Sequence, residues 1–110
     1  MGLITEERQA DESFVPSTRV WVTNPRKSAA NVEWLRFEPD TPVTGPLRTR
    51  PHVAYRVDDL AAAMDGLPVL AEPFDPTGGG DDWLRVAFVE IDGAVVEFMQ
   101  YANPDEEGWF

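Results

Sequence analysis

The sequence predicts a single α+β domain in which short strands dominate and one short helix interrupts them. The chain has 110 residues, with 43% hydrophobic and 11% aromatic content, which suits one hydrophobic core. Several segments alternate apolar and polar residues and are separated by turn residues, as half-buried strands are. The second half reads strand, helix, strand, strand, strand, and the first half echoes it with a loop in the place of the helix.

The elements of the first half follow from local residue patterns. Residues 2–5 are predicted as a short strand, and residues 6–17 are polar and aperiodic, so they are predicted as a loop. Residues 19–23 alternate and are rich in valine, so they form a strand. An Asn-Pro turn at 24–28 leads to a strand at 32–38, and three prolines make 39–46 a stiff linker.

The second half has clearer boundaries. A strand is predicted at 52–57, followed by a helix over 59–64 with Asp58 as N-cap and Gly66 as its end. Residues 69–71 form a short strand, and the glycine-rich segment 74–82 is a loop or flap over the site. The Asp92-Gly93 pair predicts a hairpin between strands 84–91 and 94–101. The tail 103–110 is predicted as irregular, with Trp109 and Phe110 docking on the body or on a partner.

The charge balance excludes several classes of function. The formal net charge is −11, from 20 acidic and 9 basic residues, so a nucleic-acid binder with a basic face is excluded. The chain has no cysteine, no apolar stretch near the ~20 residues of a membrane span, and no signal-peptide pattern. A cytoplasmic protein that binds no membrane and acts on a small molecule is therefore expected.

Two carboxylates stand inside apolar strands. Glu97 lies in 94–101, the most apolar strand of the chain, and Glu33 lies in 32–38. An unpaired buried carboxylate costs several kcal/mol, so it must be neutralised, paired or bound to a cation. His52, the only histidine, opens a third strand, and two carboxylates with one imidazole predict a divalent metal site. The alternatives are a surface or structural His52 and a half-exposed Glu33 strand.

For Glu97 the alternative to a metal is a salt bridge. The candidate partners are three arginines, Arg19, Arg56 and Arg85.

Three segments together resemble the vicinal oxygen chelate superfamily. They are PHVAYRVDDL at 51–60, VLAEPF at 69–74 and RVAFVEIDGAVVEFM at 85–99. That superfamily includes glyoxalase I, extradiol dioxygenases, methylmalonyl-CoA epimerase and the fosfomycin and bleomycin resistance proteins. The resemblance covers 51–101 strongly and 19–38 moderately. It implies paired βαβββ modules that curl into a sheet cup around one metal, with module one at about 1–38, module two at about 51–101, and no helix in module one.

The resemblance also implies the metal ligands. Carried over, they are His52 and Glu97 from module two and Glu33 from module one. Aligning residues 1–3 on 53–55 puts the fourth ligand one position before Met1. Either the chain starts late, the site has three protein ligands and a water, or the metal function is lost. Three protein ligands are acceptable for a catalytic metal, which uses open positions.

Strand alternation then assigns the faces. His52, Ala54 and Arg56 share the face that looks into the cup, and the predicted helix covers the face of Val53, Tyr55 and Val57. Arg56 can pair a substrate carboxylate or form a rim salt bridge, with equal weight. Two residues of the Glu97 face, Met99 and Tyr101, are predicted to contact the substrate.

The function implied by the resemblance is a glyoxalase-like, metal-dependent enzyme of the lyase or isomerase type. Its metal would be Zn²⁺, Ni²⁺, Mn²⁺ or Fe²⁺ and would chelate neighbouring oxygens of a small substrate. Glu97 or Glu33 would serve as general base. The alternative is a non-catalytic binding or sequestration protein of the bleomycin-resistance type. Exposed strand edges in the helix-less module, and pairing of modules between chains in related proteins, predict a homodimer.

Overall fold

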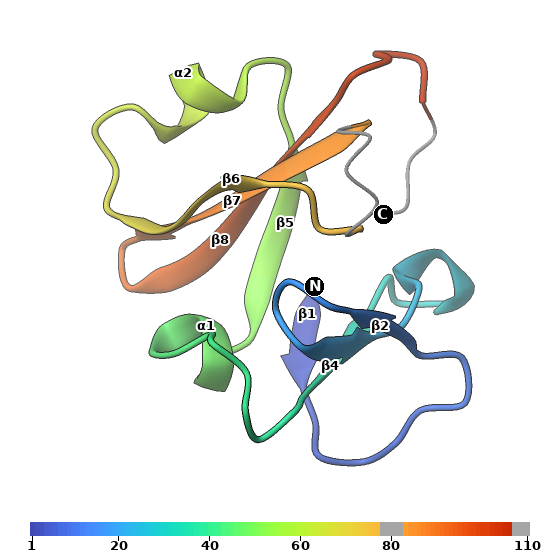
Figure 1. Ribbon diagram of the computed structural model, residues 1–110. Coiled ribbons are helices and arrows are strands. Elements are labelled where there is room, and N and C mark those ends of the chain that lie inside the picture. Colours follow the sequence, from blue (N-terminus) through green and yellow to red (C-terminus); the bar gives the residue numbers. More distant parts are fainter. Residues whose placement is uncertain (78–82, 107–110) are drawn as a thin grey trace.

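In the computed structural model, which describes residues 1–77 and 83–106, the strands form one curled sheet (Figure 1). Within the described residues the strand order is β2-β3-β4-β1-β5-β8-β7-β6. The strands of the first half are β1 Gly2–Ile4, β2 Ser13–Val15, β3 Val20–Val22 and β4 Glu33–Phe37. Those of the second half are β5 His52–Arg56, β6 Val69–Phe74, β7 Leu84–Ile91 and β8 Ala94–Tyr101. The helices are the 3-10 turn η1 Pro25–Lys27 and the short α1 Pro46–Thr49 and α2 Leu60–Met64. The predicted α+β class with a curled sheet cup is confirmed.

The sheet consists of two modules with the same strand arrangement. From the centre outwards module one runs β1, β4, β3, β2, and module two runs β5, β8, β7, β6. In each module the first strand is parallel to the last, and the remaining neighbours are antiparallel. β1 and β5 join the modules as an antiparallel pair at Gly2 and His52. This is the paired arrangement that the sequence predicts, and module two alone carries a helix between its first two strands.

The strand register relates individual residues of the two modules. Gly2 is opposite Glu33 in module one, and Ala54 is opposite Glu97 in module two. Gly2 therefore corresponds to Ala54, as the alignment of residues 1–3 on 53–55 predicts. By the same count, the position of module one that corresponds to His52 precedes Met1.

The helix α2 packs on the outer face of β7 and β8. Leu60 is 5% exposed and lies in a core with Ala87, Val89, Val96 and Phe98. The sequence predicted that the helix would cover the face of Val53, Tyr55 and Val57. Val57 does pack against the core that contains Leu60, but the prediction is wrong for Val53 and Tyr55. Val53 and Tyr55 stay 39% and 56% exposed, because α2 crosses the neighbouring hairpin instead.

Other differences from the sequence prediction are local. The 6–17 loop contains β2, which pairs with β3 and brings the ring of Phe14 within 4.9 Å of the ring of Trp21. The proline-rich linker ends in α1, which begins at Pro46. The N-cap of α2 is Asp59, not Asp58, because the Asp59 carboxylate accepts the N–H of Ala62. Longer pairing with β7 extends the predicted strand 69–71 to Phe74.

Two sequence predictions lie outside the described residues: the flap at the three glycines, within 78–82, and the docking of Trp109 and Phe110. Within the described ranges, no helix is long and apolar enough to cross a membrane.

Candidate metal centre

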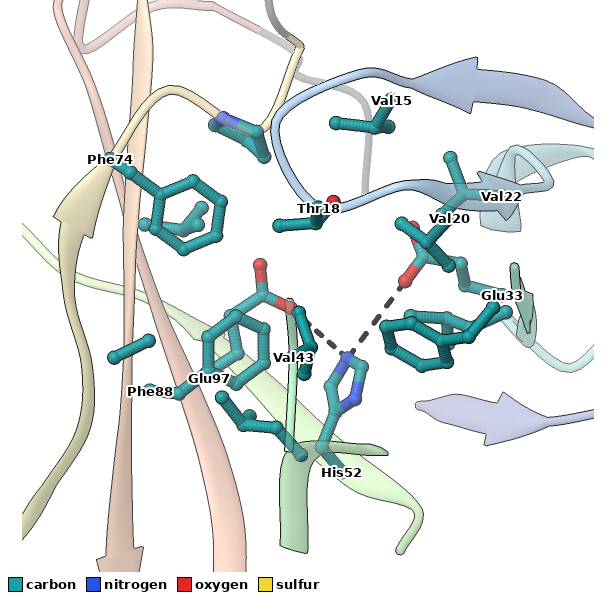
Figure 2. A pocket seen from close by; sticks show the side chains of 16 residues that line it. Val15, Thr18, Val20, Val22, Glu33, Val43, His52, Phe74, Phe88 and Glu97 are labelled. Carbon is teal, nitrogen blue, oxygen red and sulfur yellow. Dashed lines mark ion pairs between the residues drawn. The ribbon is translucent and has the colours of Figure 1, made fainter. Parts of the chain in front are cut away.

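Glu33, His52 and Glu97 come together from three strands on the concave face of the sheet (Figure 2). The Nε2 atom of His52 lies 3.1 Å from Oε1 of Glu97 and 3.8 Å from Oε1 of Glu33. One ligand atom from each residue lies within 4.8 Å of the other two. The three residues are buried, with 6%, 4% and 3% of their surfaces exposed. The sequence prediction that these side chains converge is therefore correct in its geometry.

Gly2 makes room for the imidazole ring. A Cβ atom on Gly2 would lie 2.0 Å from Cε1 of His52 and 2.4 Å from its Nε2, closer than atoms can approach. The ring thus rests directly against the backbone of β1, where β1 and β5 pair. From this position Nε2 faces both carboxylates. Only glycine permits this close approach of ring and backbone.

The donor set fits a divalent metal ion. Ligand atoms about 2.1 Å from an ion lie roughly 3.0–3.4 Å apart in octahedral or tetrahedral arrangements. The two distances from Nε2, 3.1 and 3.8 Å, are close to that range. One imidazole nitrogen with two carboxylates suits borderline and hard divalent ions. These three buried residues can therefore hold a metal ion.

The salt-bridge alternative for Glu97 is wrong, since none of the three candidate arginines pairs with it in the described structure. Arg19 pairs with Asp40 at 2.6 Å, and Arg85 donates to the carbonyl of Pro73. Arg56 donates to carbonyls of the C-terminal segment, among them that of Pro104. Glu33 is buried although its neighbour Trp34 is exposed, so the strand has one exposed face and the carboxylate lies on the other.

Burial raises the pKa of the Glu33 carboxyl well above its usual value. The neighbouring charge of Glu97 raises this pKa further, while the amino group of Met1 lowers it. Without a cation the site therefore favours a protonated Glu33. A bound divalent ion would reverse this preference, because it binds the ionised carboxylate.

Glu33, His52 and Glu97 open onto a pocket of about 110 Å³ whose walls are apolar (Figure 2). Module one provides Val15, Val20, Val22, Leu35 and Phe37; module two provides Ala71, Phe74, Val86 and Phe88. Val43 and Leu47 come from the linker and α1, and Pro76 follows β6. Beyond the three ligands, Thr18 is the one polar side chain among the described residues that line the pocket.

The predicted substrate contacts at Arg56, Met99 and Tyr101 are not among these lining residues. The Arg56 guanidinium lies 4.2 Å from the centre of the Tyr101 ring and is held by C-terminal carbonyls. Met99 and Tyr101 are buried with Leu84 and Val86. Their role in substrate binding stays a prediction that this arrangement does not favour.

Sequence reasoning missed the aromatic wall that Phe74 and Phe88 form, although the position of Phe88 could have been predicted. The two-residue turn at Asp92-Gly93 places Phe88 opposite Glu97 on the same face. The ring of Phe88 meets that of His52 edge-on at 5.2 Å and stacks on Phe74 at 6.3 Å. No local signal places Phe74, because register shifts interrupt the pairing of β6 with β7.

The comparisons with known proteins support the fold alone. No family model matches the chain, and no curated protein sequence matches it. A solved structure, that of the hypothetical protein BH1468 from Bacillus halodurans C-125, aligns with a TM-score of 0.62 at 15% sequence identity. The alignment covers 96% of this chain and 94% of that one, so the likeness extends over both modules.

Proposed function

We propose that the protein is a metal-dependent enzyme of the glyoxalase type, within the vicinal oxygen chelate superfamily. The observation that supports this proposal best is the buried triad of Glu33, His52 and Glu97. Its two carboxylates have no arginine or lysine partner in the described structure, and they face an apolar pocket. Zn²⁺, Ni²⁺, Mn²⁺ or Fe²⁺ are the ions that this donor set suits, and the substrate is a small molecule with two neighbouring oxygens.

Each residue has a distinct part in the chemistry. A divalent ion held by the three residues would supply a Lewis acid for the substrate oxygens. The backbone of Gly2 and the edge of Phe88 fix the plane of the His52 ring. The apolar walls exclude water, which strengthens every electrostatic interaction in the site. Glu33 or Glu97 accepts a proton from the carbon next to the substrate oxygens and returns it to a neighbouring carbon or to the same one.

A second candidate is a non-catalytic protein that binds or sequesters a small molecule. The composition of the pocket favours it, because Thr18 is the one polar group beyond the triad among the described lining residues. General acid–base chemistry commonly uses more than one positioned polar group. Both candidates require the pocket, but only the enzyme requires proton transfer.

Proton exchange separates the two candidates. The metal-loaded protein is mixed with 2-hydroxyacetophenone in D₂O, and loss of the substrate's α-proton signal is followed by NMR. The enzyme should exchange this proton faster than free metal, and Glu33→Gln or Glu97→Gln should lower the rate. Glu72→Gln, an exposed carboxylate on β6, is the matched control and should leave it unchanged. Binding without exchange would favour the sequestration protein.

A further inference from the structure

We infer that the pocket selects a compact, uncharged aromatic or branched apolar group attached to the oxygen pair, and rejects anionic tails such as phosphates. The oxygen pair in this inference rests on the proposed function. The group attached to the oxygen pair, here called the tail, is inferred from the pocket walls alone. Volume, charge and aromatic geometry each support it independently.

The volume suits a single ring. The cavity measures about 110 Å³, with one side open to solvent. An engineered protein cavity of about 150 Å³ lined by Leu, Ile and Phe stays dry and binds benzene. A phenyl group whose edge extends into the open mouth therefore fits, whereas a nucleotide or a peptide conjugate would have to stay largely outside.

The charge of the pocket opposes an anionic tail. No lysine or arginine is among the described lining residues, so no side chain of the pocket wall can pair with an anion. The formal net charge of −11 adds a long-range field of the same sign. The guanidinium of Arg48 lies over the ring of Phe37, 4.9 Å from its centre, but Arg48 does not line the cavity. A phosphate tail bound against the apolar walls would thus lose its hydration and gain no ion pair with a side chain.

The aromatic wall gives the tail a preferred contact. Phe74 and Phe88 are nearly parallel, with an interplanar angle of 20°. Figure 2 shows them across the pocket from Val20 and Val22. A ring inserted between these walls would replace water on apolar surfaces from both modules. Because Phe88 also contacts His52, a tail bound there lies beside the oxygen-binding end of the pocket.

The experiment uses three probes with one chelating head and different tails. Acetohydroxamic, benzohydroxamic and phosphoglycolohydroxamic acid carry a methyl, a phenyl and a phosphate group. Calorimetry with the metal-loaded protein should show the phenyl probe binding at least about tenfold more tightly than the methyl probe, from the extra apolar burial. The phosphate probe should bind most weakly. Equal affinities, or tightest binding of the phosphate probe, would overturn the inference.

Variants locate the tail. Phe74→Ala should lower the affinity for the phenyl probe roughly tenfold and leave that for the methyl probe unchanged. Phe74→Leu keeps apolar volume but removes the ring face, so it should lower the phenyl preference by a smaller but measurable factor, and it serves in place of the alanine variant if that variant is unfolded. Tyr55→Ala on the outer face of the sheet is the matched control and should change neither affinity. A phenyl preference that survives both Phe74 variants would contradict the assigned wall.

A metal-free arm keeps this inference separate from the proposed function. Toluene and phenyl phosphate do not need a chelating ion, so their binding to the metal-free protein reports the walls alone. Ligand-observed NMR should detect toluene in the pocket and not phenyl phosphate. If no metal binds but toluene does, the enzyme proposal fails and the tail inference holds. If metal binds but NMR detects no toluene in the pocket, the tail inference fails and the metal site stands.

Discussion

Module two is a complete βαβββ unit, and module one is a reduced copy of it. In module two, α2 covers the hairpin of β7 and β8, whose strands are 8 residues each. In module one the strands have 3 to 5 residues, and the loop before β2 takes the place of the helix. Glu12 of that loop forms a bidentate ion pair with Arg36 of β4, whose guanidinium lies over the Trp21 ring. A polar network thus covers part of the face that a helix covers in module two.

Module one also contributes less than module two to the candidate metal site. Module two contributes His52 and Glu97, while module one contributes only Glu33 and places Gly2 against the imidazole. Module two therefore supplies two of the three candidate ligands and the larger core. Module one supplies one carboxylate, part of the pocket wall and the space for the imidazole ring.

The largest expected difference between the modules is in stability. Leu60→Ala should lower the free energy of unfolding by about 2–5 kcal/mol, because it leaves a cavity under α2 that cannot collapse fully. Trp34→Ala on the outer face of module one should cost far less, since Trp34 is 37% exposed. Urea unfolding of the two variants measures both values. Equal losses would contradict the packing of Leu60 in a core beneath α2.

Gly2→Ala tests the part of module one in the site. The added methyl group collides with the His52 ring, so the ring must move and metal affinity should fall about a hundredfold. Ala54→Gly, at the corresponding position of module two, is the matched control. It removes a methyl group without displacing a ligand, so the affinity should change little. Metal binding by Gly2→Ala at wild-type strength would refute the close approach.

A histidine placed directly before Met1 tests the correspondence of the modules. By the observed register this position matches His52, so the added imidazole should tighten metal binding ten- to a hundredfold. An alanine at the same position is the control for the longer chain. Calorimetry that finds identical affinities would show that this position does not reach the metal.

The smallest effect concerns pH and the raised pKa of Glu33. The folded metal-free protein holds the Glu33 proton more tightly than the unfolded chain, whose pKa is near 4.5. The stabilisation from this proton is complete below pH 4.5 and is lost as the pH rises toward the folded pKa. Relative to Glu33→Gln, the metal-free wild type should therefore lose stability as the pH increases. Parallel stability curves for the two proteins would show that the pKa is not raised.

Groups that do not interact with Glu33 cancel in this comparison. Glu12 acts with the opposite sign, because its hydrogen bond to Arg36 lowers its pKa. Its stabilisation is present at neutral pH and is lost as the pH falls, in the wild type and in Glu33→Gln alike.

The sequence predicted those features that depend on short-range signals. Glu33 and Glu97 were recognisable because a carboxylate in an apolar strand is costly, and the hairpin followed from Asp92-Gly93. Distant pairing was predicted only with the help of the family resemblance, as for the paired modules and the convergence of the three side chains. Distant contacts outside that pattern were not predictable. The pairing of β2 with β3 overrides a polar local sequence, and the contact between Gly2 and His52 exists only because β1 and β5 are neighbours. Arg56 has the strand position that predicts a side chain facing the cup, but its guanidinium donates to carbonyls of the C-terminal segment. The alternation of side chains along a strand does not predict this contact.

The outer face of the sheet around β4 and β5 also bears on association. Trp34, Val53 and Tyr55 are exposed there, outside the reach of α2. Self-association of the chain through such a face stays a prediction.

Direct metal binding by the untagged protein tests the central claim most simply. Zn²⁺, Ni²⁺, Mn²⁺ and Fe²⁺ are titrated by calorimetry into the EDTA-treated wild type, Glu97→Gln and the control Glu72→Gln, with thermal melting followed in parallel. We expect one ion per chain for at least one metal, with a gain of about 2.7 kcal/mol in stability at a hundredfold excess over the dissociation constant. Glu72→Gln should match the wild type, and Glu97→Gln should lose most of the binding. Absence of heat and of any melting shift with all four ions, or equal binding by Glu97→Gln, would contradict a metal centre at Glu33, His52 and Glu97.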